Sequence, residues 1–162
     1  MTTEKKFIIR TMISGWVRKT RVLKYRLKGY QIAFSASIEG GVMLDKLNPT
    51  GINIGDNTLV ARGAVILSHH HHKRTPSNNP ILCNTFIGKN SLIGINSIIM
   101  PGIKVGDEVI VGAGAVVTKD VRSNCVVAGN PGRVIKEGIK MNEFAVLCQQ
   151  NKVDERVSKY EK

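Results

Sequence analysis

The chain has 162 residues and 42% apolar content, which suits a single domain with a hydrophobic core. Aromatic residues make up only 5%, so Ile, Val, Leu and Ala must build that core, and a net charge of +12 favours anionic partners. No run of about 18 apolar residues and no secretory signal pattern is present, so we expect no transmembrane helix and a cytoplasmic protein.

The three cysteines are Cys83, Cys125 and Cys148. Their number is odd and their spacing does not match a metal site. We therefore expect free thiols in a reducing compartment.

Residues 4–28 combine apolar positions with a basic cluster that runs from Arg18 to Lys28. This pattern predicts an amphipathic helical cap over the end of whatever follows. The cluster is compatible with a solvated helical face, a phosphorylated ligand such as a long anionic cofactor, or peripheral contact with an anionic membrane surface. No nucleic-acid partner is expected, because the sequence has no helix-turn-helix pattern and no basic motif interleaved with aromatic residues.

A six-residue repeat dominates the middle of the chain. Aliphatic residues recur at steps of six, and the positions are Ile54, Val60 and Ile66, then Ile87, Ile93, Ile99, Val105, Val111 and Val117. A helix would space its apolar residues by three and four, whereas six is a multiple of the strand period of two. Glycine follows several of these aliphatics, where we expect the chain to turn. Three short strands per turn predict a coil of 18 residues, with coils stacked by parallel pairing.

The blocks INIGDN-TLVARG-AVILSH and FIGKNS-LIGINS-IIMPGI-KVGDEV-IVGAGA-VVTKDV, followed by AGNPGRVIKE, resemble the hexapeptide-repeat acyltransferases. Within that family they are most similar to the maltose, galactoside and polysaccharide O-acetyltransferases. The resemblance spans residues 36–137. It implies a mainly β fold, a left-handed parallel β-helix, a homotrimer, and acetyl-coenzyme A as the acyl donor.

The repeat breaks between Ile66 and Ile87, where we expect a projecting loop over residues 72–86 that is rich in Pro, Ser and Asn. All four histidines of the chain, His69 to His72, lie where strand gives way to this loop. Adjacent histidines alternate between the two faces of a strand, so few of them can converge on one ion, and we expect no functional metal.

A general base is the better interpretation of the histidines, because acyl transfer to a hydroxyl requires removal of a proton from a very weak acid. The resemblance places that base at His71, with His69, on the same face of the strand, as the fallback. His70 and His72 are expected to point the other way.

The resemblance implies further site residues. Asn48 falls where relatives carry an acidic residue near the acceptor, and Asp45 is an alternative that could orient the acceptor or the imidazole. The backbone N–H of Ile95 corresponds to the oxyanion donor. Relatives carry a tryptophan at the position of Leu92, so one aromatic wall of the thioester channel is missing.

Five positions match coenzyme A contacts in the family: Ala113, Thr118, Lys119, Arg133 and Lys136. The small Ala113 would let the pantetheine arm lie against the coil, and the basic residues would meet the phosphates. A basic surface without a ligand is the alternative for these charges. Pro131 suits an exit from the repeat, because proline cannot continue a strand ladder.

Residues 139–160 are expected to form a C-terminal helix. The leading functional prediction is transfer of an acetyl group from acetyl-coenzyme A to a hydroxyl of a sugar or glycan precursor, without a metal. The alternatives are N-acetylation of a nucleotide-linked amino sugar, an enzyme similar to serine acetyltransferase, and a solenoid scaffold with no activity.

Overall fold

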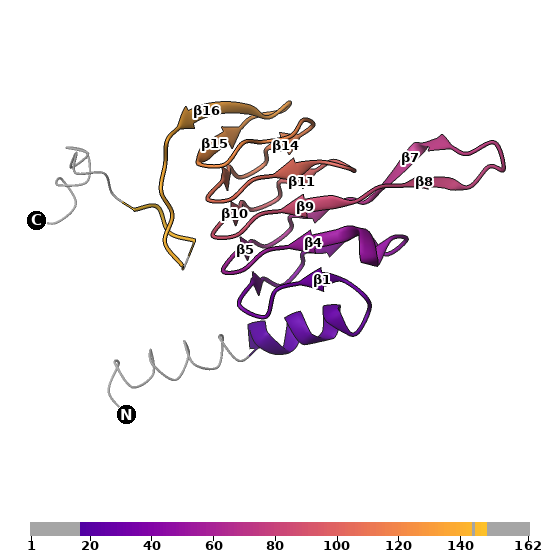
Figure 1. Ribbon diagram of the computed structural model, residues 1–162, viewed down its shortest axis with the longest axis horizontal. Helices are drawn as coiled ribbons and strands as arrows, with labels where there is room; N and C mark the ends of the chain where they lie inside the picture. Colours follow the sequence, from indigo (N-terminus) through magenta and orange to yellow (C-terminus); the bar gives the residue numbers. More distant parts are fainter. Residues whose placement is uncertain (1–16, 144, 149–162) are drawn as a thin grey trace, which may run out of the picture.

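A computed structural model describes residues 17–143 and 145–148. In this part of the chain, short strands form three parallel sheets around a common interior, and an antiparallel hairpin projects from one side (Figure 1). One helical segment, residues 17–26, precedes the strands. None of the described helical segments is long and apolar enough to span a membrane.

Each sheet takes one strand from each coil. Sheet A contains β1 (Gln31–Ile32), β4 (Ile52–Ile54), β9 (Thr85–Ile87) and β12 (Lys104–Val105). Sheet B contains β2 (Ser37–Ile38), β5 (Leu59–Val60), β10 (Leu92–Ile93), β13 (Ile110–Val111), β15 (Cys125–Ala128) and the antiparallel β16 (Arg133–Glu137). Sheet C contains β3 (Met43–Leu44), β6 (Val65–Ile66), β11 (Ile98–Ile99) and β14 (Val116–Val117). The hairpin consists of β7 (His69–Arg74) and β8 (Pro80–Leu82).

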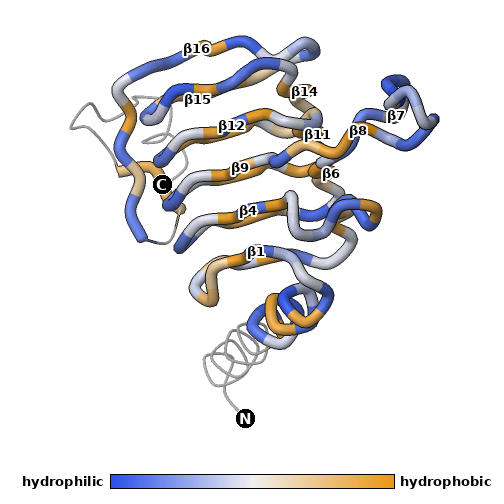
Figure 2. The backbone as a smooth tube through the Cα atoms, turned by 45° about the vertical axis from the view of Figure 1, so that its right-hand side comes forward, coloured by the Kyte–Doolittle hydropathy of each residue, from blue (hydrophilic) through white to orange (hydrophobic). Residues whose placement is uncertain are grey.

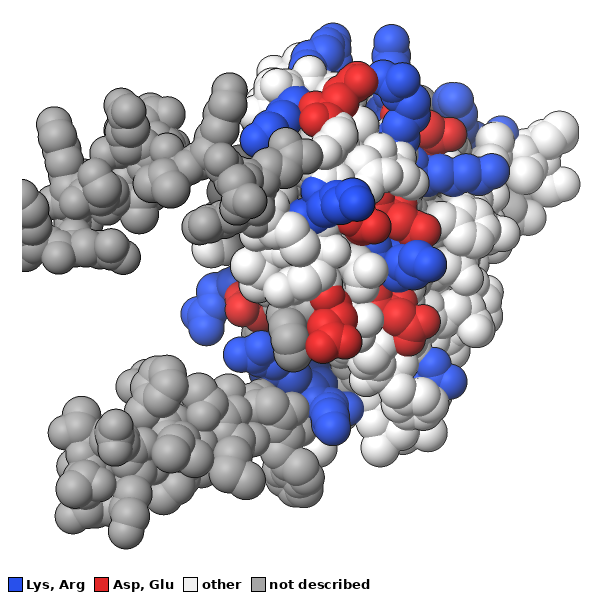
Figure 3. Space-filling view, turned by 60° about the vertical axis from the view of Figure 1, so that its left-hand side comes forward, with Lys and Arg blue, Asp and Glu red and all other residues white. Residues whose placement is uncertain are grey.

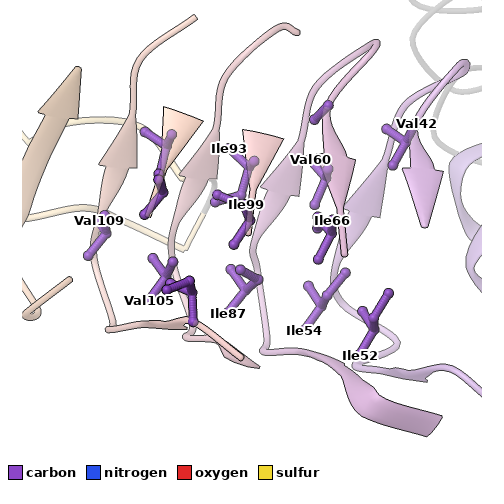
Figure 4. Packing of buried hydrophobic residues seen from close by; sticks show 14 of the residues in the cluster. Val42, Ile52, Ile54, Val60, Ile66, Ile87, Ile93, Ile99, Val105 and Val109 are labelled. Atoms are coloured by element: carbon purple, nitrogen blue, oxygen red, sulfur yellow. The ribbon is translucent and has the colours of Figure 1, made fainter. Parts of the chain in front are cut away.

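The six-residue repeat sets the register of all three sheets. In sheet B, for example, Val60 pairs with Ile93 and Ile93 pairs with Val111. The repeating aliphatics point inward and are at most 3% exposed, so they stack into columns that fill the interior (Figure 4). The predicted parallel coil is therefore present, while its left-handed winding stays a prediction.

The coils begin earlier than the predicted residue 36. Ile32 in β1 pairs with Ile54, so the six-step pattern extends upstream through Ile38 and Leu44. At the other end, β16 turns back antiparallel on β15 after Pro131.

The glycines that follow the aliphatics serve close stacking of the coils. A Cβ atom on Gly106 would lie 2.6 Å from the backbone nitrogen of Ser123 in the next coil. The left-handed backbone of that corner falls two positions later, at Glu108 with a φ of 54°. The expectation that these glycines are needed for the turn itself is therefore wrong at Gly106, where the close approach of the next coil requires glycine.

The helical segment 17–26 covers the open end of the first coil. Val22 is 1% exposed and packs into the core. Arg21 and Arg26 donate hydrogen bonds to the backbone carbonyls of Ile38 and Ile32. Residues 4–16 of the predicted cap lie outside the described residues.

The C-terminal segment covers the outer face of sheet B. Ile139, Met141 and Ala145 pack against the outward side chains of that sheet. The backbone N–H of Met141 donates to the Glu108 carboxylate over 2.8 Å, which fixes the segment in an extended path. Residues 139–143 and 145–148 form no helix, contrary to the helix predicted over 139–160, and the remainder of that range lies outside the described residues.

Candidate active site

Two insertions occur at the same corner of the coil, between sheet C and sheet A. The first follows Leu44 and contains the 3-10 turn η1 (Pro49–Gly51), and the second follows Ile66 and contains the hairpin. Since β3 pairs with β6 and β4 with β9, the two insertions lie in neighbouring coils, one above the other. In Figure 2 the hairpin leaves the wall of stacked coils at this level. The region predicted as a loop over 72–86 is thus mostly hairpin, and its last residues already belong to sheet A.

Asp45 and His69 meet where the two insertions start. The Nδ1 atom of His69 forms a short hydrogen bond with Oδ2 of Asp45. Asp45 is 7% exposed and His69 is 8% exposed. The neutral imidazole tautomer that donates its Nδ1–H to the carboxylate keeps its lone pair on Nε2, the arrangement that a general base requires.

Backbone amides hold the carboxylate of this pair. The N–H of Leu47 donates to Asp45 Oδ1 over 3.0 Å, and the N–H of Ser68 donates to Oδ2 over 2.8 Å. Burial raises the pKa of Asp45, but the two amides and His69 together outweigh burial, so the pKa lies below its usual value. The carboxylate is therefore ionised at neutral pH and fixes the orientation of the imidazole.

Tyr30, in the first coil, forms a hydrogen bond with the backbone of Asp45. Its hydroxyl donates to the carbonyl of Asp45 over 3.0 Å, and its side chain is buried. Burial, followed by the charges of Tyr25 and Asp45, raises the pKa of the Tyr30 phenol. Sequence reasoning missed both residues, because Tyr30 donates to a backbone carbonyl, Ser68 holds the carboxylate through its own backbone N–H, and neither belongs to a motif.

Asn48 ties the hairpin to the first insertion. Its side-chain amide donates to the carbonyls of Ser68, over 3.0 Å, and Cys83, over 3.1 Å, which flank the hairpin. In return the Ser68 hydroxyl donates to the Asn48 carbonyl over 2.8 Å. A side chain at Gly51 would run into the Asn48 amide, so glycine is required there by close approach. Both amide protons of Asn48 are thus committed to backbone, which favours a positioning role over the predicted contact with an acceptor.

The other histidines follow the alternation of β7. The rings of His70 and His72 lie 5.7 Å apart at an angle of 75°, on a common face of the strand. The backbone of His71 belongs to β7, but its side chain lies outside what the structure describes. No group of three or more His, Cys, Asp or Glu side chains in the described part of the chain is arranged to hold a metal ion.

The remaining predicted residues lie at two different corners. Ile95 and Ala113 lie in successive turns between sheets B and C. The N–H of Gly114, next to Ala113, donates to the Ile95 carbonyl over 2.8 Å. Arg133 is the first residue of β16 and lies at the same end of sheet B. Thr118 and Lys119 follow β14 at the corner that carries Asp45 and His69, while Lys136 lies further along β16. The side chains of all six residues are exposed, namely those of Ile95, Ala113, Thr118, Lys119, Arg133 and Lys136. One copy of the chain therefore brings Asp45, Asn48 and His69 together and leaves Ile95, Ala113 and Arg133 at the opposite edge of sheet C.

Known proteins share this architecture. A family model described as "Hexapeptide repeat of succinyl-transferase" matches residues 85–119. The Bacillus subtilis (strain 168) protein named "Putative acetyltransferase YvoF" is 34% identical over 132 residues, which cover 81% of this chain and 70% of that protein. The chain belongs to the hexapeptide-repeat acetyltransferase family.

Two solved acetyltransferases of this kind align with the chain. A maltose O-acetyltransferase from Clostridium difficile 630 superposes with a TM-score of 0.58 at 29% identity, covering 70% of this chain and 72% of that one. A galactoside acetyltransferase in complex with coenzyme A superposes with a TM-score of 0.52 at 31% identity, covering 64% of this chain and 62% of that one. The chain therefore spans less than two thirds of the galactoside enzyme.

Proposed function

We propose that this hexapeptide-repeat protein transfers an acetyl group from acetyl-coenzyme A to a hydroxyl of a sugar or glycan precursor, with His69 as the general base. The observation that carries the proposal is the buried hydrogen bond between His69 Nδ1 and Asp45. A fixed imidazole with a negative partner suits removal of a proton from a hydroxyl, which is too weak an acid to ionise at neutral pH.

His69 was the second of the two candidates from the sequence. Its contact with Asp45 moves the proposal from His71 to His69. The role of Asp45 changes as well, because a carboxylate that accepts hydrogen bonds from two amides and an imidazole is a positioning group for the base. When His69 becomes protonated, Asp45 stabilises the imidazolium.

Acetyl-coenzyme A as donor is supported by the coenzyme A bound to the galactoside acetyltransferase that this fold resembles. Ala113, Thr118, Lys119 and Arg133 are exposed and so are accessible to a ligand. We propose that Ala113 leaves room for the pantetheine arm and that Arg133 and Lys136 meet phosphate groups. The N–H of Ile95 would donate to the oxyanion that develops on the thioester carbonyl.

A homotrimer would complete the site, because the two groups of residues lie at opposite edges of sheet C in one copy. The outward residues of that sheet are Met43, Val65, Ile98 and Val116. Met43 is 63% exposed, whereas Ile139, Met141 and Ala145 pack against the outward residues of sheet B. A neighbouring copy packed on sheet C would bring its Ile95 corner beside the His69 corner of the first copy.

Release of free thiol from acetyl-coenzyme A, measured across sugars, nucleotide sugars, amino sugars and serine, tests the proposal. We expect release with a hydroxyl acceptor and its loss in His69→Ala. Release with an amino sugar alone would favour N-acetylation, release with serine alone would favour an enzyme of the serine acetyltransferase kind, and no release with any acceptor would favour a scaffold.

A further inference from the structure

The end of the molecule formed by the helical segment 17–26 and the first coil carries an exposed apolar patch. Leu27 is 80% exposed, Phe34 is 65% exposed and Leu23 is 48% exposed. Leu23 and Leu27 are one helical turn apart, and the Leu27 N–H donates to the Leu23 carbonyl, so both lie on the outer face of the helix. Val22, on the opposite face, is buried in the core. The helix thus has two apolar faces, and only one of them is covered by the described residues.

Basic side chains flank this patch. At 100° per residue, Lys19 and Arg26 fall on one side of the Leu23–Leu27 stripe and Lys24 falls on the other. All three are exposed, and Figure 2 shows hydrophobic and hydrophilic stretches alternating along the helix. Arg26 also stacks 4.0 Å from the centre of the Phe34 ring, which joins the aromatic residue to the patch.

Within positions 17–34 the charge has one sign. No acidic residue occurs between positions 17 and 34, where the basic residues are Arg18, Lys19, Arg21, Lys24, Arg26 and Lys28. On the side wall, by contrast, acidic and basic groups are interspersed, and basic atoms gather at the lower end in Figure 3. We call this surface the basic end patch and define it by Lys19, Leu23, Lys24, Arg26, Leu27 and Phe34.

We propose that the basic end patch docks the protein onto the surface of an anionic lipid bilayer, with the helix lying in the plane of the interface. Leu23, Leu27 and Phe34 would enter the boundary between headgroups and acyl chains, while the long side chains of Lys19 and Lys24 reach the lipid phosphates. This combination of an apolar stripe with flanking cations is the pattern that interfacial helices use. The proposal is independent of the acetyl transfer described above.

Two other occupants fit the patch less well. A second copy of the chain docked end to end would bring two basic helical segments together, which is repulsive because positions 17–34 supply no acidic residue to pair with them. A nucleic acid would pair with the basic side chains. It would also place its charged phosphates against Leu23 and Leu27, which is unfavourable because interfaces with nucleic acid are polar. Only a lipid surface accommodates both the charge and the apolar stripe.

Co-sedimentation of the full chain with vesicles tests the proposal. Vesicles of phosphatidylcholine alone are compared with vesicles of phosphatidylcholine and phosphatidylglycerol. We expect binding to the mixed vesicles only, and weaker binding as salt is raised. The double variant Lys19→Gln, Lys24→Gln should lower the partition coefficient at least tenfold, since each basic residue near an anionic surface contributes a factor of roughly five. The double variant Leu23→Ser, Leu27→Ser should lower it by a similar factor.

Matched controls separate the patch from general effects. Lys89→Gln with Lys104→Gln removes two exposed charges from other parts of the coil, and Val146→Ser removes an exposed apolar residue elsewhere, so both variants should bind like the parent. Unchanged melting temperatures would show that the patch variants remain folded. Equal binding to both kinds of vesicle, or equal binding of the patch and control variants, would overturn the proposal. The proposal would also be overturned if the patch variants changed the oligomer size in the absence of vesicles. Binding to a nucleic acid that the patch variants lose, without any binding to lipid, would overturn it as well.

Discussion

Asp45 and His69 form a buried hydrogen bond although they are 24 positions apart in the sequence and belong to neighbouring coils. Each residue opens an insertion at the corner between sheets C and A. Because β3 pairs with β6, the ends of these strands are adjacent, and the first residues of the two insertions meet. The regular stacking of the coils therefore determines the geometry of the proposed base.

This pair gives the first prediction. His69→Ala should lower kcat by roughly 10²- to 10⁴-fold, the usual effect of losing a positioned base. Asp45→Asn should lower kcat by a smaller factor, because the imidazole remains but loses its negative partner. Steady-state rates of thiol release measure both effects. The matched variant is His71→Ala: if it loses more activity than His69→Ala, the base is His71 and the assignment made here is wrong.

Asn48 gives the second prediction. Asn48→Ala removes both hydrogen bonds to the carbonyls that flank the hairpin, and it should lower the free energy of unfolding by about 1–3 kcal/mol. Chemical denaturation measures this loss. The side chain of Asn79 is exposed at the tip of the hairpin, so Asn79→Ala should cost far less. A large rise in the KM for the acceptor in Asn48→Ala, without loss of stability, would instead support direct contact between Asn48 and the acceptor.

The core of this fold could be predicted from the sequence, because a single rule generates it. Steps of six fix which side chains point inward, so Val60, Ile93 and Val111 are all predicted to face the core, and the register of sheet B then places them in one column. Ile32, Ile38 and Leu44 keep the same step within the first coil, but the insertion after Leu44 places Ile54 ten positions later, so steps of six back from Ile54 miss this coil.

The candidate site was harder to predict from the sequence, because the two insertions interrupt the six-residue spacing there. The two insertions have different lengths, so spacing alone could not decide whether His69 or His71 faces Asp45. The role of Asn48 was also hidden, since the carbonyls that it binds belong to residues far away in the sequence. Contacts with backbone groups leave no signature in residue type.

The third prediction concerns the pH dependence of stability. The folded pKa of Asp45 lies below its ordinary value of about 3.9, so this carboxylate stabilises the protein fully above that pH. The contribution is lost as the pH falls through the lowered folded pKa, where the native state must take up the proton. The difference in unfolding free energy between the parent and Asp45→Asn should therefore shrink as the pH drops below about 4. Exposed Glu143 provides the control, and a constant difference for Asp45→Asn across this range would contradict the argument.

The fourth prediction concerns the trimer. Ile98 points outward from the centre of sheet C, between Val65 and Val116, so Ile98→Glu places a charge in the proposed contact between copies. Sedimentation velocity should show a trimer for the parent and smaller species for this variant. Lys104→Glu, on the outer face of sheet A, should leave the trimer intact. If the parent sediments as a monomer at micromolar concentration, both the proposed trimer and the proposed site shared between copies are wrong.

The last prediction concerns coenzyme A. Arg133 and Lys136 are exposed, so each contact with a phosphate contributes only on the order of 0.5–1 kcal/mol. The double variant Arg133→Ala, Lys136→Ala should raise KM for acetyl-coenzyme A by about tenfold and change kcat little, because contacts with the phosphates hold the cofactor equally in the ground state and in the transition state. The parent KM should rise with salt, and the KM of the variant should depend on salt less steeply, because fewer charges remain to be screened. Lys89→Ala with Lys104→Ala removes the same amount of charge from other exposed positions and should leave KM unchanged. If the two double variants behave alike, Arg133 and Lys136 are solvated surface charges, and the phosphates are bound elsewhere.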